Sequence, residues 1–129
     1  MKHTAVVIFC AVLVLAGCRS GNKAKVSETE LSAVRAAQTQ LTVGASKQTT
    51  LAAFKYGKKT KLGSSKVDGV AIEEWNVEAF HDNDWAKRRE MTLVYLYFLN
   101  DKLVESSDKR LNYRGTPALV EQWRSTAAK

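Results

Sequence analysis

The chain has 129 residues, with 20 Lys and Arg against 13 Asp and Glu, so its formal net charge is +7. This length corresponds to one domain. A domain of this size hides only about 60–70% of the surface of its unfolded chain, which leaves little room for a deep internal active site.

The first residues are organised like an export signal. Lys2 precedes an apolar run from Ala5 to Gly17, and this run ends in the small residues Ala16 and Gly17. A positive start, an apolar centre and a small-residue processing site are typical of a secretory signal peptide. The run is short for a spanning helix, which needs about 20 apolar residues. We therefore expect residues 1–17 to be cleaved, and we favour this over an uncleaved signal anchor.

The end of the run, Leu15-Ala16-Gly17-Cys18, resembles the lipobox of bacterial lipoproteins. The resemblance implies that Cys18 carries covalent lipid, the only cofactor-like group expected. Several acyl chains anchor stably, because each buried CH₂ contributes about 0.8 kcal/mol. Arg19 stands where the inner-membrane retention signal has Asp, which implies the periplasmic leaflet of the outer membrane. Cys10 would leave with the signal, so the mature chain would have no disulfide and no cysteine nucleophile or metal ligand.

Basic residues occur in short groups along the rest of the chain. They are Lys55, Lys58, Lys59, Lys61 and Lys66, then Lys87-Arg88-Arg89, then Lys109-Arg110. Export argues against nucleic acid as a partner, and no nucleic-acid-binding motif accompanies these groups. A solvated surface is the simplest interpretation. The alternative is attraction to anionic lipid headgroups, at about 1 kcal/mol per Lys or Arg near such a surface.

Two helices are predicted before the first strand. Residues 18–27 read as a lipidated Cys and a flexible linker, and Ser27 with Glu30 offers a capping box for a helix over 28–39. Ser46 is the expected N-cap of a second helix, which we expect to end before Gly57. The Lys-, Ser- and Gly-rich residues 58–69 are predicted to form a loop.

Three strands are predicted next, at residues 70–80, 91–99 and 102–106, with residues 81–90 as a polar connection and Asn100-Asp101 as a two-residue turn. The pattern of the second strand, apolar or aromatic on both faces, is that of a central strand. Two helices followed by an antiparallel meander indicate an α+β fold, with the helices on one sheet face.

A short C-terminal helix is predicted over residues 117–127. Pro117 fits its first position, and Trp123 is expected to dock on the domain. We therefore divide the chain into a signal, a linker, an α+β domain at residues 28–108 and a C-terminal extension at 109–129.

Residues 40–107 are similar to the SmpA/OmlA (BamE-like) family of outer-membrane lipoproteins. The similarity is carried by Gln40-Leu41-Thr42-Val43-Gly44-Ala45-Ser46-Lys47, Tyr56-Gly57, Glu74-Trp75-Asn76-Val77, and the hairpin Leu96-Tyr97-Phe98-Leu99-Asn100-Asp101-Lys102-Leu103. The resemblance implies two helices on three antiparallel strands, a fold also seen in β-lactamase inhibitor proteins. It also implies a non-enzymatic role and a partner in the envelope, such as the outer-membrane β-barrel assembly machinery.

The sequence contains little that resembles catalytic or metal-binding chemistry. His81-Asp82-Asn83-Asp84 has metal-ligating residue types, but a structural loop is the favoured interpretation. Glu73 and Glu74 are adjacent on a strand and point to opposite faces, so they cannot form a paired-carboxylate site; we expect them on the exposed face. No nucleophile elbow, phosphate-binding loop or zinc motif is present. We predict no catalytic residue, no metal site and no small-molecule substrate.

The remaining candidate site lies in residues 81–90. Trp85 stands there in a polar context next to Lys87, Arg88 and Arg89. An exposed Trp flanked by cations indicates a contact with a partner or with the membrane interface. The equally weighted alternative is that Trp85 folds back onto the sheet.

These features favour a lipid-anchored envelope module that binds proteins, with residues 81–90 and the sheet edge as its contact surface. The second hypothesis, which rests on fold-level analogy alone, is an inhibitor-like module that blocks an envelope or foreign enzyme. An enzyme is the least favoured.

Overall fold

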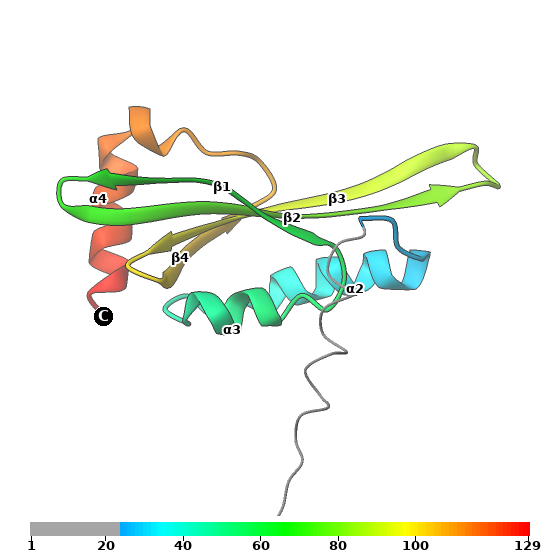
Figure 1. Cartoon of the computed structure of the whole chain (residues 1–129), viewed down its shortest axis with the longest axis horizontal. Coiled ribbons are helices and arrows are strands. Elements are labelled where there is room, and N and C mark those ends of the chain that lie inside the picture. The colour runs from blue at the N-terminus through cyan, green and yellow to red at the C-terminus, as the bar shows by residue number, and fades with distance from the viewer. Residues whose placement is uncertain (1–23) are drawn as a thin grey trace, which may run out of the picture.

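The computed structural model describes residues 24–129. The signal, Cys18 and most of the linker lie outside these residues. The elements in chain order are α2 (Glu28–Thr39), α3 (Lys47–Ala52), β1 (Lys58–Val67), β2 (Val70–Asn83), β3 (Arg88–Leu99), β4 (Lys102–Ser107), the short 3-10 helix η2 (Tyr113–Gly115) and α4 (Pro117–Ala127). The sheet lies between two helical layers, with α2 and α3 below it in Figure 1 and α4 against its opposite side.

The sheet is an antiparallel meander in the order β1-β2-β3-β4. The predicted α+β class with an antiparallel sheet is confirmed, but the predicted number of strands is wrong, because there are four. The extra strand is β1, in the segment predicted as a loop. Asp68 and Gly69 have φ values of 50° and 82°, so they form a tight turn that places Val67 opposite Val70. Main-chain pairing with β2 then holds β1 despite its polar side chains, and lysines are common on such edge strands.

Residues 81–90 are also more regular than expected. β2 continues to Asn83 and β3 begins at Arg88, so only residues 84–87 form the turn. Asp82 lies opposite Arg89 in the register, and Arg89 Nε donates to Asp82 Oδ1 at 3.0 Å. Cross-strand pairs of opposite charge stabilise an antiparallel ladder, which is why most of this polar segment forms strands. The prediction that residues 81–90 are a connection between strands is wrong except at residues 84–87.

The first predicted helix is confirmed as α2. The capping box is present, since the Glu30 amide donates to Ser27 Oγ at 3.1 Å and the Ser27 amide donates to Glu30 Oε2 at 2.7 Å. Leu31 and Val34 are the buried residues of this helix. Its apolar stripe therefore packs on the domain.

The second helix is shorter than expected. Ser46 caps α3 as predicted, but α3 ends at Ala52, so Gly57 does not terminate it. Gly57 instead has a φ of 95° and lies against β2, where a Cβ atom would be 3.0 Å from Val77 Cγ1 and 3.1 Å from the Glu78 carbonyl oxygen. This glycine allows the chain to turn closely past β2 into β1.

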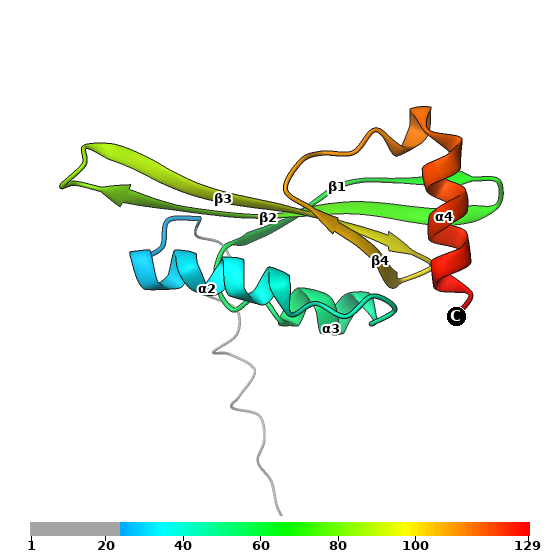
Figure 2. The ribbon, with the colours of Figure 1, turned by 180° about the vertical axis from the view of Figure 1, so that it is seen from behind.

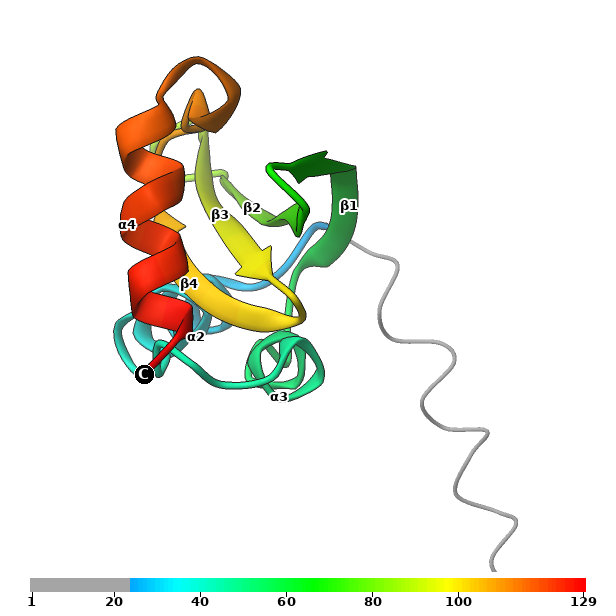
Figure 3. The same ribbon diagram turned by 90° about the vertical axis from the view of Figure 1, so that its left-hand side faces the viewer.

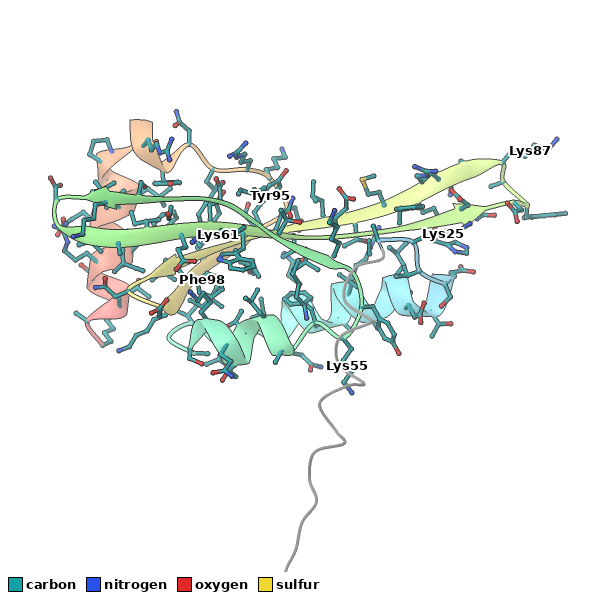
Figure 4. All side chains as sticks on the ribbon, in the orientation of Figure 1. Lys25, Lys55, Lys61, Lys87, Tyr95 and Phe98 are labelled. Carbon is teal, nitrogen blue, oxygen red and sulfur yellow. The ribbon has the colours of Figure 1, made fainter. Side chains whose placement is uncertain are left out.

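Each face of the sheet has its own core. Figure 4 shows Tyr95 and Phe98 on opposite sides of the strands. The core beneath α2 and α3 contains Val26, Leu31, Val34, Phe54, Val77, Ala79, Val94, Leu96, Phe98 and Leu103. The core beneath α4 contains Ile72, Tyr97, Leu99, Val104, Tyr113, Val120 and Trp123. Both cores draw on β3, which confirms it as the central strand.

α4 packs on the sheet through Trp123, as expected. Trp123 is 1% exposed, and its ring stacks on Tyr97 with centroids 5.0 Å apart. Its Nε1 donates to Glu105 Oε1 at 2.8 Å. Figures 2 and 3 show α4 standing across the sheet on the side away from α3. Residues after β4 are thus part of the packed structure.

On the opposite face of the sheet, ion pairs hold α3 against the strands. Lys47 Nζ of α3 lies 2.8 Å from Glu73 Oε2 and 3.0 Å from Asp101 Oδ1. Trp75 Nε1 also donates to Glu73 Oε1 at 3.0 Å. The hydrogen bond from Lys47 lowers the pKa of Glu73 against the opposing effect of burial, and the same bond raises the pKa of Lys47. Glu73 therefore lies in the contact between α3 and the sheet, and the prediction that it lies on an exposed face is wrong.

Trp123→Ala should lower the free energy of unfolding by about 3–5 kcal/mol, because it removes a large buried ring. Trp85→Ala is the matched control: Trp85 is 93% exposed, so its loss should change stability by no more than about 0.5 kcal/mol. Urea unfolding followed by circular dichroism measures both. Equal effects would show that α4 is not part of the folding unit.

Glu73→Gln should reduce stability at pH 7 by about 1–2 kcal/mol, because this partly buried pair lies between an exposed ion pair, at about 0–1 kcal/mol, and a hydrogen bond to a charged group, at about 1.5–3 kcal/mol. Because the pKa of Glu73 is lower in the folded protein, its contribution is present above the unfolded pKa of about 4.3 and is lost as the pH falls through the folded pKa. The free energies of unfolding of the wild type and the variant, measured in urea, should therefore differ at pH 7 and agree at acid pH. A difference in the free energy of unfolding that stays constant across this pH range would show that the ionisation of Glu73 does not contribute to stability.

Candidate functional site

The tip of the β2–β3 hairpin presents Trp85 to solvent. Trp85 is 93% exposed, and Figure 4 shows Lys87, two residues further along the chain, at the far end of the hairpin. Asn83 Oδ1 accepts from the Ala86 amide at 3.0 Å, and Lys87 has a φ of 50°, so the turn itself has a defined conformation. The alternative in which Trp85 folds back onto the sheet is excluded.

The cations near the tip are largely paired. Arg89 and Lys25 both contact Asp82, at 3.0 and 3.4 Å, and Arg88 Nη2 lies 3.5 Å from Glu90 Oε1. The hydrogen bond from Arg89 is the main cause that lowers the pKa of Asp82. Within residues 24–129, Lys87 has no carboxylate partner. The hairpin is thus of mixed charge, and its exposed aromatic ring is the feature that stands out.

An apolar strip adjoins the tip on the face that carries α4. Phe80 lies opposite Met91 in the register, and the Arg89 guanidinium is 4.3 Å from the centroid of the Phe80 ring. Met91 is 48% exposed. In Figure 1, α4 lies toward the other end of the sheet, so it does not cover this strip.

The outer half of β3 has a neighbour on one side only. β2 pairs with β3 as far as Asn83 opposite Arg88, whereas β4 pairs with β3 only as far as Tyr95 opposite Ser107. Among the residues described, no other strand pairs with residues 88–94. We call residues 88–94 the open edge. Such an edge offers unpaired main-chain groups to another chain.

A groove of about 470 Å³ runs between α2 and the open edge, lined by Arg35, Gln38, Thr39, Met91, Thr92, Leu93 and Asp108. Arg35 Nε donates to Thr92 Oγ1 at 2.7 Å, and its Nη2 donates to the Met91 carbonyl at 3.4 Å. Gln38 Nε2 donates to Asp108 Oδ1 at 3.0 Å, just after the end of β4. This groove could not be predicted from the sequence, since it depends on where α2 lies relative to β3.

The His-Asp-Asn-Asp segment is structural. His81 Nδ1 lies 3.2 Å from the Val26 carbonyl oxygen, and the Phe80 main chain bonds to Ala24 and Val26. These contacts hold the N-terminal segment against β2. In residues 24–129, no group of three or more His, Cys, Asp or Glu could hold a metal ion.

Glu74 occupies a second polar cluster, on the α4 face. It is 4% exposed, contrary to the predicted exposed position, and lies on the opposite face from Glu73, as predicted. Arg110 donates to both carboxylate oxygens, at 3.0 and 3.1 Å, and the Tyr97 hydroxyl donates at 2.9 Å. Burial raises the pKa of Tyr97, so the hydroxyl stays protonated as a donor. Three of the roughly four acceptor sites of this carboxylate are thus used within the fold, which indicates a structural role for Glu74.

A helix long and apolar enough to cross a bilayer is not found among the described residues. No family model, curated protein or solved structure matches the chain.

The hairpin tip, the apolar strip and the open edge together form the candidate functional site.

Arg89→Ala should raise the pKa of Asp82, which Arg89 lowers in the wild type. NMR titration of the carboxyl signals should place the wild-type Asp82 midpoint below the ordinary aspartate pKa of about 3.9 and the variant's midpoint closer to that pKa. Arg124→Ala is the control: among the described residues Arg124 of α4 forms an ion pair with Glu121 alone, so its loss should leave the pKa of Asp82 unchanged. Identical Asp82 midpoints in all three proteins would show that this ion pair does not close the hairpin in solution.

Proposed function

We propose that this chain is a lipid-anchored envelope lipoprotein that works as a small protein-binding or scaffold module. The observation that carries the proposal is the projecting hairpin with Trp85 93% exposed at its tip. Trp is costly to leave in water and is enriched at the centres of protein interfaces. A rigid strand pair that presents Trp at its end suits contact with a partner.

The lipobox and the position of the N-terminal segment support an anchored role. Ala24 and Val26 lie beside Phe80 in β2, close to the hairpin. The stretch from Cys18 to Ala24 spans at most about 20 Å at about 3.3–3.6 Å per residue. A lipid on Cys18 would therefore keep the candidate site near the membrane surface, where an outer-membrane assembly would meet it.

The proposal takes kinship with the SmpA/OmlA (BamE-like) family, and with the β-lactamase-inhibitor-like fold, from the sequence resemblance of residues 40–107. On this proposal the protein is not an enzyme, it lies on the periplasmic leaflet of the outer membrane, and its partner belongs to the envelope, with the β-barrel assembly machinery as the first candidate. Fold-level kinship supports a class of role and not a particular partner.

Replacing Trp85 with the photoreactive residue p-benzoylphenylalanine should yield crosslinks to an outer-membrane assembly protein in native envelopes. The same replacement at Val43, which is 54% exposed and lies between α2 and α3, is the matched control and should yield at least tenfold less adduct. Cys18→Ala should abolish membrane fractionation and reduce the adduct at position 85.

The other outcomes decide against parts of this proposal. Crosslinking to one soluble enzyme, together with loss of that enzyme's activity, would support the inhibitor-like alternative. Adducts to lipid alone would make Trp85 a membrane contact and overturn the protein-binding role. Membrane fractionation of Cys18→Ala like the wild type would overturn the lipid anchor.

A further inference from the structure

We propose that the open edge of β3 accepts an extended segment of a partner protein as an added strand, and that this segment alternates acidic and apolar residues. The inference rests on the proposed function as a binding module and names the chemistry of what is bound. Addition of a strand to a free sheet edge supplies affinity through main-chain hydrogen bonds and specificity through alternate side chains.

The direction of the main-chain groups follows from the register. The Asn100 amide donates to the Ala71 carbonyl at 3.0 Å, on the β2 side of the hairpin. Because main-chain groups alternate in direction along an antiparallel strand, the odd-numbered residues of β3 point away from β2. The Met91 carbonyl confirms this direction, since it accepts from Arg35. Arg89, Met91 and Leu93 therefore turn their amide and carbonyl groups toward the groove.

Arg35 sets the charge on one side of the added strand. It lies in the wall that α2 forms, and within residues 24–129 it has no carboxylate within salt-bridge distance. Its bonds to Thr92 and Met91 are to neutral oxygens, at 2.7 and 3.4 Å. The other charged group of the groove, Asp108, is bonded to Gln38. A carboxylate on the helix-facing side of the incoming strand would form an ion pair with Arg35.

The opposite side of the added strand would be apolar. Side chains alternate along β3, so Met91 and Leu93 face the side away from α2, where Met91 is 48% exposed. The end of the site is set by Ser107, which occupies the place opposite Tyr95. The other end leads to the turn that carries Trp85. An extended segment with alternate carboxylate and apolar side chains matches both sides of this edge.

A second copy of this chain is the competing occupant of this edge. If two open edges paired antiparallel with Met91 opposite Met91, Lys87 of one copy would fall opposite Tyr95 of the other. Ser107 already occupies that place. Two copies could therefore pair through residues 88–94 and no further, and dimerisation of the protein is the outcome that would identify this occupant.

The test uses the full-length lipidated protein in detergent micelles and a blocked, fluorescein-labelled hexapeptide of alternating valine and glutamate. Fluorescence anisotropy should show saturable binding, and NMR should show slower amide exchange at Met91 and Leu93. Valine–lysine peptide, and a valine–glutamate peptide with a central proline, should bind at least tenfold more weakly. The first control reverses the charge, and the second cannot form a continuous strand.

Arg35→Glu should weaken binding of the glutamate peptide at least tenfold and should favour the lysine peptide instead. Arg114→Glu is the matched control: Arg114 is also an exposed arginine, but it lines a different pocket on the α4 face, so it should leave both affinities unchanged.

Three results would overturn the strand-addition proposal: no saturable binding, equal binding of the three peptides, or slowed exchange only on the outer edge of β1. Concentration-dependent dimerisation with protection of Met91 would assign the edge to a second copy and would also overturn it. None of these results bears on crosslinking at position 85, which alone decides the proposed function.

Discussion

The structure depends on the long antiparallel pairing of β2 with β3. This ladder runs from Ile72 opposite Leu99 to Asn83 opposite Arg88, and each of its faces supports one core. α2 and α3 cover one face and α4 covers the other. Neither helical layer could bury its apolar side without this pair of strands. Because β1 and β4 are shorter than the pair they flank, the same ladder also projects beyond the packed domain and forms the candidate site.

Features set by neighbouring residues could be predicted from the sequence. The capping box of Ser27 and Glu30 and the turn at Asn100-Asp101 depend on contacts within a few residues, and both form. β1 was missed because its Lys, Ser and Gly content suggested a loop. The signal for it was Asp68-Gly69 between two valines, a strong two-residue hairpin pattern. Once that turn forms, main-chain pairing along β2 outweighs the weak strand preference of the side chains.

The candidate site was predictable only in part. Trp85 stood out in the sequence because its polar neighbours offer it no apolar surface to pack on. The open edge could have been inferred from strand lengths, since a two-residue turn and a short β4 cannot cover all of β3. The positions of Arg35 and Arg110 could not be inferred. Each meets its partner across a long stretch of chain, Thr92 in one case and Glu74 in the other, and local patterns carry no information on such contacts.

The lysines of β1 bear on how copies of the protein behave when crowded. β1 is a terminal strand of the sheet, and Lys58, Lys59, Lys61 and Lys66 lie along it. If the chain is lipid-anchored, as proposed, its copies share a plane and collide far more often than the same number of molecules free in solution. Two copies that approached through this strand would bring like charges together before their main chains could pair. Aggregation through β1 is thereby opposed, whereas the open edge of β3 has no lysine in its seven residues.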